Sequence, residues 1–201
     1  PQLDINARTW FYLYWQGFHR AVQALKGEKF DIVHNHFDWP FLVLNEILRC
    51  PIITTVHNPF QFAFAADDIY SHWPYIRISN SQRKVLPNLN FLATVYNGIE
   101  VDSFEFNDKP QPYLAFLGRI TPDKGPEQAI AVAKKTRRKL LIAARVDQPD
   151  RQYFKKVIKP LIDGEQIVFL GEVDHKEKVE LLKNAQALLS PVQWDEPFGL
   201  T

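Results

Sequence analysis

Short apolar runs alternate with amphipathic segments along most of this 201-residue chain, and this alternation limits its fold more than any other feature. Helical patterns separate many of the runs and begin near Asn6, Pro40, Asn80, Glu127 and Arg151. Strands that alternate with helices form a parallel sheet with right-handed crossovers, so we predict an α/β fold. The runs typical of buried strands cover residues 30–34, 52–56, 76–79, 91–96, 113–117, 140–144, 167–170 and 187–190.

A polar stretch over residues 100–112, with several acidic residues and two prolines, is the best candidate for a linker. It predicts two domains, residues 1–105 and 106–201. The formal charge of +1, from 24 basic and 23 acidic residues, argues against a broad nucleic-acid surface. The single cysteine, Cys50, rules out an internal disulfide and favours a reducing, cytoplasmic location. No apolar run is long enough to span a bilayer.

The first helical pattern, residues 6–25, carries several aromatic residues, among them Trp10, Phe11 and Phe18. A helix that lies on a membrane surface is one interpretation, and peripheral membrane contact stays an alternative. Packing against a sheet is favoured, because the polar face of this helix lacks a cluster of lysine and arginine. Near the other end of the chain, Asp174 and Glu177 have the spacing of a capping box and predict the start of a helix.

The stretch at residues 113–125, YLAFLGRITPDKG, combines a predicted strand, a loop with two cations and the start of a helix. We expect Gly118 to end the strand, and Arg119 and Lys124 to belong to the loop. Pro126 is acceptable in the first turn of the helix that follows. Two cations beside a helix start suit an anionic group, most naturally a phosphate. The alternative is a surface loop whose two charges are simply solvated.

Other polar residues follow predicted strands and should gather at the same kind of sheet edge, where ligands bind in open α/β sheets. They are His34 or His36, His57 and, in the last loop, Glu196. Pro197 favours an extended conformation at Glu196. We expect Phe198, Gly199 and Leu200 to open a helix with free N–H groups. The alternative interpretation is that the histidines and Glu196 have structural roles only. The candidate residues of this sheet edge are His34, His36, His57, Glu196, Phe198, Gly199 and Leu200.

Six motifs occur in an order that resembles the retaining glycosyltransferases of family 4, which have the GT-B fold. They are DIVHNH at 31–36, ITTVH at 53–57, ISNSQR at 78–83, VYNGI at 95–99, GRITPDKG at 118–125 and EPFGL at 196–200. Two parts of the family's pattern are absent. The glycine-rich opening loop is expected before Pro1, and the second glutamate of the E-x7-E motif is expected beyond Thr201. The resemblance therefore predicts a piece that is incomplete at both ends.

The resemblance implies two Rossmann-like parallel-sheet domains that face each other across a cleft, an acceptor side first and a nucleotide-sugar side second. It implies a retaining, hexosyl-type transferase that uses a donor such as a UDP- or GDP-sugar, with no cofactor and no metal. The acceptor, a saccharide, lipid or small molecule, stays open. By the same resemblance, Gly118, Arg119 and Lys124 hold the diphosphate, and Glu196 binds the sugar hydroxyls. The backbone of Phe198, Gly199 and Leu200 touches sugar and phosphate, and His36 lies near the reacting carbon.

Two other functions remain open at this stage. A sugar-nucleotide epimerase of the same fold would need carboxylates placed for elimination of the nucleotide, and no suitable set is evident in the sequence. A non-catalytic nucleotide-sugar-binding protein would bind the donor without transfer. A dinucleotide oxidoreductase is disfavoured, because no G-x-G-x-x-G sequence follows any predicted strand.

Overall fold

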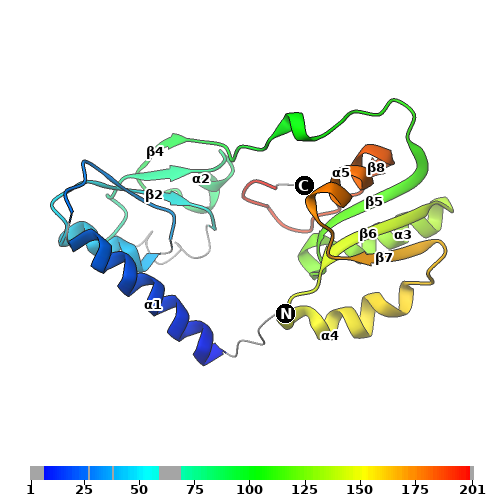
Figure 1. The fold of residues 1–201 in the computed structure, drawn as a ribbon, viewed down its shortest axis with the longest axis horizontal. Coiled ribbons are helices and arrows are strands. Elements are labelled where there is room, and N and C mark those ends of the chain that lie inside the picture. Colours follow the sequence, from blue (N-terminus) through cyan, green and yellow to red (C-terminus); the bar gives the residue numbers. More distant parts are fainter. Residues whose placement is uncertain (1–6, 27, 38, 59–68, 200–201) are drawn as a thin grey trace. The chain divides into compact units, whose positions relative to one another are not determined.

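The computed structural model describes residues 7–26, 28–37, 39–58 and 69–199. The chain divides into two compact units, unit 1 over residues 1–97 and unit 2 over residues 98–201 (Figure 1). Each unit contains a four-stranded sheet, and every strand pair is parallel. The predicted α/β class with two parallel sheets is therefore confirmed. The division between the units precedes the polar stretch at residues 100–112.

Unit 1 has strands in the order β1-β2-β3-β4, the order in which they occur along the chain. Their bounds are β1 Val33–Asn35, β2 Ile52–Val56, β3 Tyr75–Arg77 and β4 Phe91–Thr94. The helices are α1 Ala7–Lys26, a 3-10 helix Trp39–Glu46 and the short α2 Gln82–Val85. The helix predicted to begin near Pro40 is thus a 3-10 helix that begins at Trp39. Pro40 sits at its start, where a missing N–H costs nothing.

The second half of α1 packs against the sheet of unit 1, as its apolar spacing predicts. Phe18, Val22 and Leu25 contact a buried cluster that includes Phe41 and Ile52. The first half of the helix differs, because Phe11 and Tyr12 are 61% and 64% exposed. The apolar stripe is therefore buried over only part of the length of the helix.

Unit 2 has strands in the order β7-β6-β5-β8. The strands are β5 Gln111–Arg119, β6 Lys139–Arg145, β7 Ile167–Gly171 and β8 Ala185–Leu188. Helix α3 spans Pro126–Thr136 and α5 spans His175–Asn184. Between β6 and β7, α4 Arg151–Tyr153 continues as a π-helical turn, Phe154–Ile158, and a 3-10 turn, Lys159–Leu161. Single 3-10 turns occupy Val101–Ser103, Pro122–Lys124 and Gln148–Asp150.

The side chains of β5 alternate between two buried clusters, one with α3 and one with α5, which makes unit 2 Rossmann-like. Leu114 and Phe116 pack in one buried cluster with Ile130 of α3. Tyr113 and Ala115 pack in a second cluster with Leu181 of α5. Because successive strand residues point to opposite faces, both faces of the central strand are covered.

Strand β5 runs farther than predicted, because Gly118 does not end it. Gly118 pairs with Ala144 and Arg119 pairs with Arg145 in the parallel ladder with β6. A glycine within a strand is tolerated when the neighbouring strand continues to supply hydrogen bonds, and β6 extends just as far. Arg119 therefore projects from the end of a strand and not from a free loop.

Candidate functional site at the carboxyl edge of unit 2

The segment that follows β5 has the geometry of a tight loop before a helix. Residues 122–124 form a 3-10 turn, and Gly125 adopts a left-handed conformation with φ 70°. Pro126 is the first residue of α3, as predicted. A Cβ atom added to Gly125 would lie 2.1 Å from the carbonyl oxygen of Pro191. Only glycine fits at this position, because both the backbone angle and the close approach exclude a side chain.

The last described segment, residues 191–199, docks on this loop. The Gln193 N–H donates to the carbonyl oxygen of Asp123 at 2.7 Å. Lys124 Nζ forms an ion pair with Glu196 Oε1, and their side chains are only 14% and 22% exposed. Two residues that lie 72 positions apart in the chain thus meet in one site.

The predicted helix opening at Phe198 is not observed in the part of the segment that the structure describes, which ends at Gly199. Phe198 and Gly199 lie in irregular backbone, and Gly199 has φ 77°. The predicted site residue Leu200 lies outside the described residues. The backbone roles of these three residues stay predictions.

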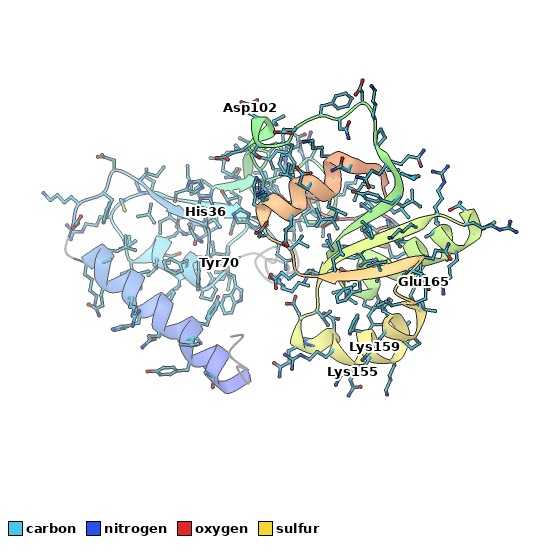
Figure 2. All side chains as sticks on the ribbon, turned by 45° about the vertical axis from the view of Figure 1, so that its right-hand side comes forward. His36, Tyr70, Asp102, Lys155, Lys159 and Glu165 are labelled. Atoms are coloured by element: carbon cyan, nitrogen blue, oxygen red, sulfur yellow. The ribbon has the colours of Figure 1, made fainter. Side chains whose placement is uncertain are left out.

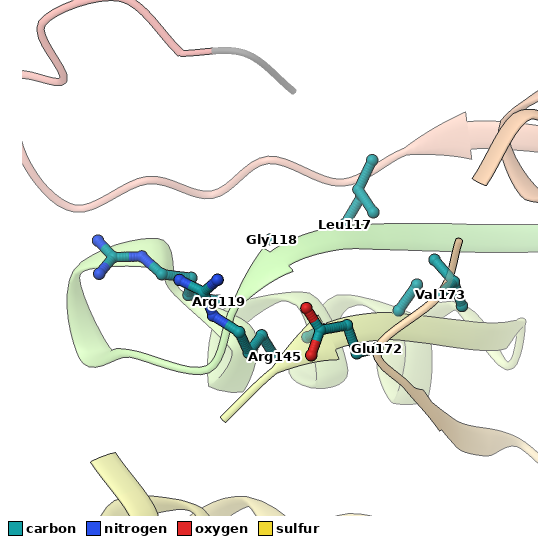
Figure 3. Close-up of a pocket in the computed structure, with 8 residues that line it drawn as sticks. Leu117, Gly118, Arg119, Arg145, Glu172 and Val173 are labelled. Atoms are coloured by element: carbon teal, nitrogen blue, oxygen red, sulfur yellow. The ribbon is translucent and has the colours of Figure 1, made fainter. Parts of the chain in front are cut away.

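Two arginines from neighbouring strands share one carboxylate beside this loop. Arg145 Nε lies 2.8 Å from Asp147 Oδ1, and Arg145 Nη2 donates to Asp147 Oδ2 at 3.3 Å. Arg119 Nη1 lies 3.9 Å from the same Oδ2. Figure 3 shows both arginines at a cavity of about 280 Å³, whose wall includes the small residues Gly118 and Ala144. Cations therefore line an open space at the carboxyl edge of the sheet, where α/β proteins bind ligands.

Asp150 is a second carboxylate that interacts with Arg119. Burial raises the pKa of Asp150, and the carboxylates of Asp147 and Asp123 raise it further, while Arg119 opposes the rise. These couplings place Arg119, Asp147 and Asp123 within electrostatic range of Asp150. The cations of this edge are thus largely matched by anionic side chains.

The predicted histidines of unit 1 also come together, at the carboxyl ends of β1 and β2. His36 Nδ1 and His57 Nε2 share a hydrogen bond of 2.9 Å, and His34 Nε2 lies 2.8 Å from Thr55 Oγ1. Figure 2 shows His36 in its setting. Burial lowers the pKa of His34 and of His57, and the nearby His36 lowers both further. The rings of His34 and His57 therefore favour the neutral form in this cluster.

Sequence reasoning missed Arg145 and Asp147. The predicted strand 140–144 stops one residue short of Arg145, so this side chain was not placed at the sheet edge. The signal was present, because Arg145 and Asp147 follow an apolar strand in the same way as Arg119 follows another. Arg145 and Asp147 pair within one segment, but their approach to Arg119 depends on strand register, which a single sequence does not specify.

Among the described residues, no group of three or more His, Cys, Asp or Glu side chains has the arrangement of a metal site. The metal-independent reaction stays a prediction. The described residues contain no helix with the length and apolarity needed to cross a bilayer.

Two protein-family models match the chain, and together they cover nearly all of it. The model described as Glycosyltransferase Family 4 matches residues 2–103, and the model described as Glycosyl transferases group 1 matches residues 99–201. An uncharacterised 41.2 kDa protein in the cps region of Klebsiella pneumoniae is 23% identical, over 89% of this chain and 58% of that protein. The glycogen synthase of Mycobacterium tuberculosis is 26% identical, over 85% and 48%. The chain thus spans about half the length of the curated relatives it matches.

Solved structures confirm the predicted GT-B type of fold. HepE of Anabaena, solved in complex with UDP-glucose, has a TM-score of 0.68 at 16% identity, over 94% of this chain and 58% of that one. The catalytic domain of starch synthase IV from Arabidopsis thaliana, bound to ADP and acarbose, has a TM-score of 0.64 at 14% identity, over 94% and 57%. Each of the two family models matches about half of the chain, and the two parallel sheets agree with the fold of the solved structures. The chain therefore belongs to the family 4 and group 1 glycosyltransferases.

Proposed function

We propose that the protein transfers a sugar, of hexosyl type, from a nucleotide-sugar donor to an acceptor hydroxyl with retention of configuration. The acceptor class, saccharide, lipid or small molecule, is left open by the site. Unit 2 supplies the donor site in this proposal, and unit 1 supplies the acceptor side. HepE and starch synthase IV, which resemble the chain in fold, were solved with UDP-glucose and with ADP. These ligands support a donor of the nucleoside-diphosphate class.

The observation that carries the proposal is the docking of residues 191–199 on the loop after β5. It brings Lys124 and Glu196 into contact, beside Arg119 at the edge of the same sheet. Cations at this position suit a diphosphate, and a carboxylate suits neutral sugar hydroxyls, which donate hydrogen bonds to it. A nucleotide sugar offers both groups in one molecule.

The chemistry follows from the charge that develops when the sugar–phosphate bond breaks. The sugar carbon takes on oxocarbenium character, and the departing diphosphate gains negative charge. Arg119 and Lys124 stabilise that charge, and each ~1.4 kcal/mol of stabilisation is tenfold in rate. In front-face attack, the acceptor oxygen bonds to the same face of the carbon and its proton passes to the leaving phosphate. His36 enters the proposal from the resemblance alone, as a unit 1 group near the reacting carbon.

The experiment that tests the proposal is a calorimetric screen of UDP-, GDP- and ADP-sugars against the intact protein, followed by analysis of the product. A bound donor, a transferred sugar and an unchanged anomeric configuration are the expected results. Binding with no transfer to any acceptor would make the protein a nucleotide-sugar-binding protein. Conversion of the donor to an epimer would assign it to the epimerase class.

Replacing Lys124 provides the first test at the residue level. Lys124→Ala removes a charge-assisted contact, so we expect nucleoside-diphosphate affinity to fall by about 1.5–3 kcal/mol. Calorimetric titration with the nucleoside diphosphate that binds most tightly measures this change in affinity. Lys155→Ala, on the outer helical segment of unit 2 (Figure 2), is the matched control. Unchanged affinity in folded Lys124→Ala would mean that the loop is a surface turn.

A further inference from the structure

We propose that Arg145 is a positioning residue that keeps Asp147 from neutralising Arg119, so that Arg119 is available to the donor diphosphate. The inference rests on the proposed function, because it takes Arg119 to be a diphosphate ligand. It assigns a role to a pair of residues, Arg145 and Asp147, that the motifs leave without one.

The charges at this edge of unit 2 create the need for such a residue. The described side chains here include three cations and five carboxylates, so no surplus of positive charge awaits an anion. Lys124 is already paired with Glu196. A diphosphate binds more tightly when at least one of these cations is not neutralised by a carboxylate partner. The set is Arg119, Lys124, Arg145, Asp123, Asp147, Asp150, Glu172 and Glu196.

The contacts of Asp147 are unequal. Its two oxygens lie 2.8 Å and 3.3 Å from nitrogens of Arg145, whereas the nearest nitrogen of Arg119 lies at 3.9 Å. The two-point contact with Arg145 has the geometry of a strong carboxylate–guanidinium pair, and the contact with Arg119 does not. Arg145 is therefore the main partner of Asp147, and Arg119 is held only weakly.

Strand register fixes the positions of Arg119 and Arg145 relative to Asp147. Arg119 and Arg145 are direct partners in the parallel ladder of β5 and β6, so their side chains leave the same face of the sheet. Asp147 follows β6 by two residues and reaches both. Without Arg145, Arg119 would be the nearest cation to Asp147 and would take its place. The Asp147 carboxylate would then neutralise Arg119 and repel a phosphate that approaches it.

One other role for Arg145 must be separated from this one. Arg145 lines the cavity in Figure 3, so it could touch the nucleotide directly. A direct ligand loses its contact whether Asp147 is charged or neutral. A positioning residue matters only while Asp147 carries its charge, so a double-mutant cycle distinguishes the two.

The experiment titrates UDP, GDP and ADP into the intact protein by calorimetry and uses the tightest of them for the variants. We expect Arg145→Met to weaken binding about fivefold, the scale of one part-exposed ion pair. Asp147→Asn should bind as tightly as the unaltered protein or more tightly. The double variant Arg145→Met, Asp147→Asn should match Asp147→Asn alone. Arg145→Lys keeps the charge but not the two-point contact, so it should recover only part of the loss.

Two results would overturn the inference. If Arg145→Met weakened binding equally with Asp147 intact and in the Asp147→Asn variant, Arg145 would be a direct ligand. No weakening at all would leave Arg145 without a role in binding. Arg119→Ala, titrated in parallel, separates the two proposals. If Arg119→Ala binds normally, the diphosphate site itself is wrong, and the inference falls with it.

Discussion

At the scale of single residues, Glu196 has an unusual position for a group in a phosphate site. Its carboxylate is paired with Lys124, and both are mostly buried. A bound diphosphate would compete for Lys124, and sugar hydroxyls would compensate Glu196 for the loss of its partner. The pair is thus matched to a ligand that carries both kinds of group.

Glu196→Gln should separate sugar recognition from nucleotide recognition. The glutamine keeps the size but loses charge-assisted bonds to hydroxyls, so transfer should fall by roughly 10–100-fold. Affinity for the bare nucleoside diphosphate should hold or improve, because Lys124 is freed. Steady-state transfer and calorimetry measure the two effects.

Glu165→Gln is the matched control for this variant, since Glu165 lies in the turn before β7 (Figure 2). It should leave both quantities unchanged. Equal loss of transfer and of diphosphate binding in folded Glu196→Gln would make Glu196 a structural support of its loop.

At the scale of elements, the site depends on how closely two loops approach. Gly125 allows the loop after β5 to contact Pro191, and the Asp123–Gln193 hydrogen bond holds the loops together. The end of α3 shows that a left-handed backbone does not always require glycine. Helix α3 has no glycine at its end, and Arg137 adopts the left-handed conformation there with φ 54°. The Arg137 and Arg138 N–H groups bond to the last turn of α3, which offsets the strain.

Gly125→Ala should loosen the docked loops and so weaken both stability and donor binding. The left-handed backbone alone costs about 1–2 kcal/mol for a residue with a Cβ atom, and the clash with Pro191 adds to it. Urea unfolding and nucleoside-diphosphate titration are the measurements.

Gly164→Ala is the control for the backbone term. Gly164 also has a positive φ, 81°, but its Cβ would meet no atom within 4 Å. It should lose stability and keep donor affinity. If Gly125→Ala and Gly164→Ala were equally mild in both assays, the close approach to Pro191 would be irrelevant to the site.

At the scale of the whole molecule, the two units have separate cores, and we expect their stabilities to respond separately to pH and to ligand. The histidines with lowered pKa, His34 and His57, belong to unit 1, and the residues of the proposed donor site belong to unit 2. Near pH 6.5, the unfolded chain binds more protons at these histidines than the folded unit does. The stability of unit 1 should therefore fall as the pH drops below about 6.5.

Calorimetric scans at pH 7.5 and pH 5.5 should resolve this difference as two unfolding transitions. Acidification should lower the transition of unit 1. A nucleoside diphosphate at about 100 times its dissociation constant should raise that of unit 2 by roughly 10 °C. His57→Gln should reduce the pH response, and His19→Gln on α1 is its control. One transition that moves as a whole would contradict the separation.

Several features of this protein follow from its sequence alone. Apolar runs bounded by polar turns predicted the strands, and the run at 52–56 matches β2 residue for residue, because side-chain burial is a local pattern. Asp174 and Glu177 form the predicted capping box of α5, since such a cap needs only four consecutive residues. The family motifs singled out Lys124 and Glu196, which the structure brings into contact, while their role and that of Arg119 in binding a donor stay predictions.

Tertiary structure decided the features that depend on residues far apart in the chain. Strand register extended β5 through Gly118 and placed Arg119 beside Arg145. The docking of residues 191–199 paired Glu196 with Lys124, and the turn after β6 brought Asp147 between two arginines. Local pattern carries no information on these distances. They are set by how the two strand ends and their loops pack, and the charge balance of the site is a consequence of that packing.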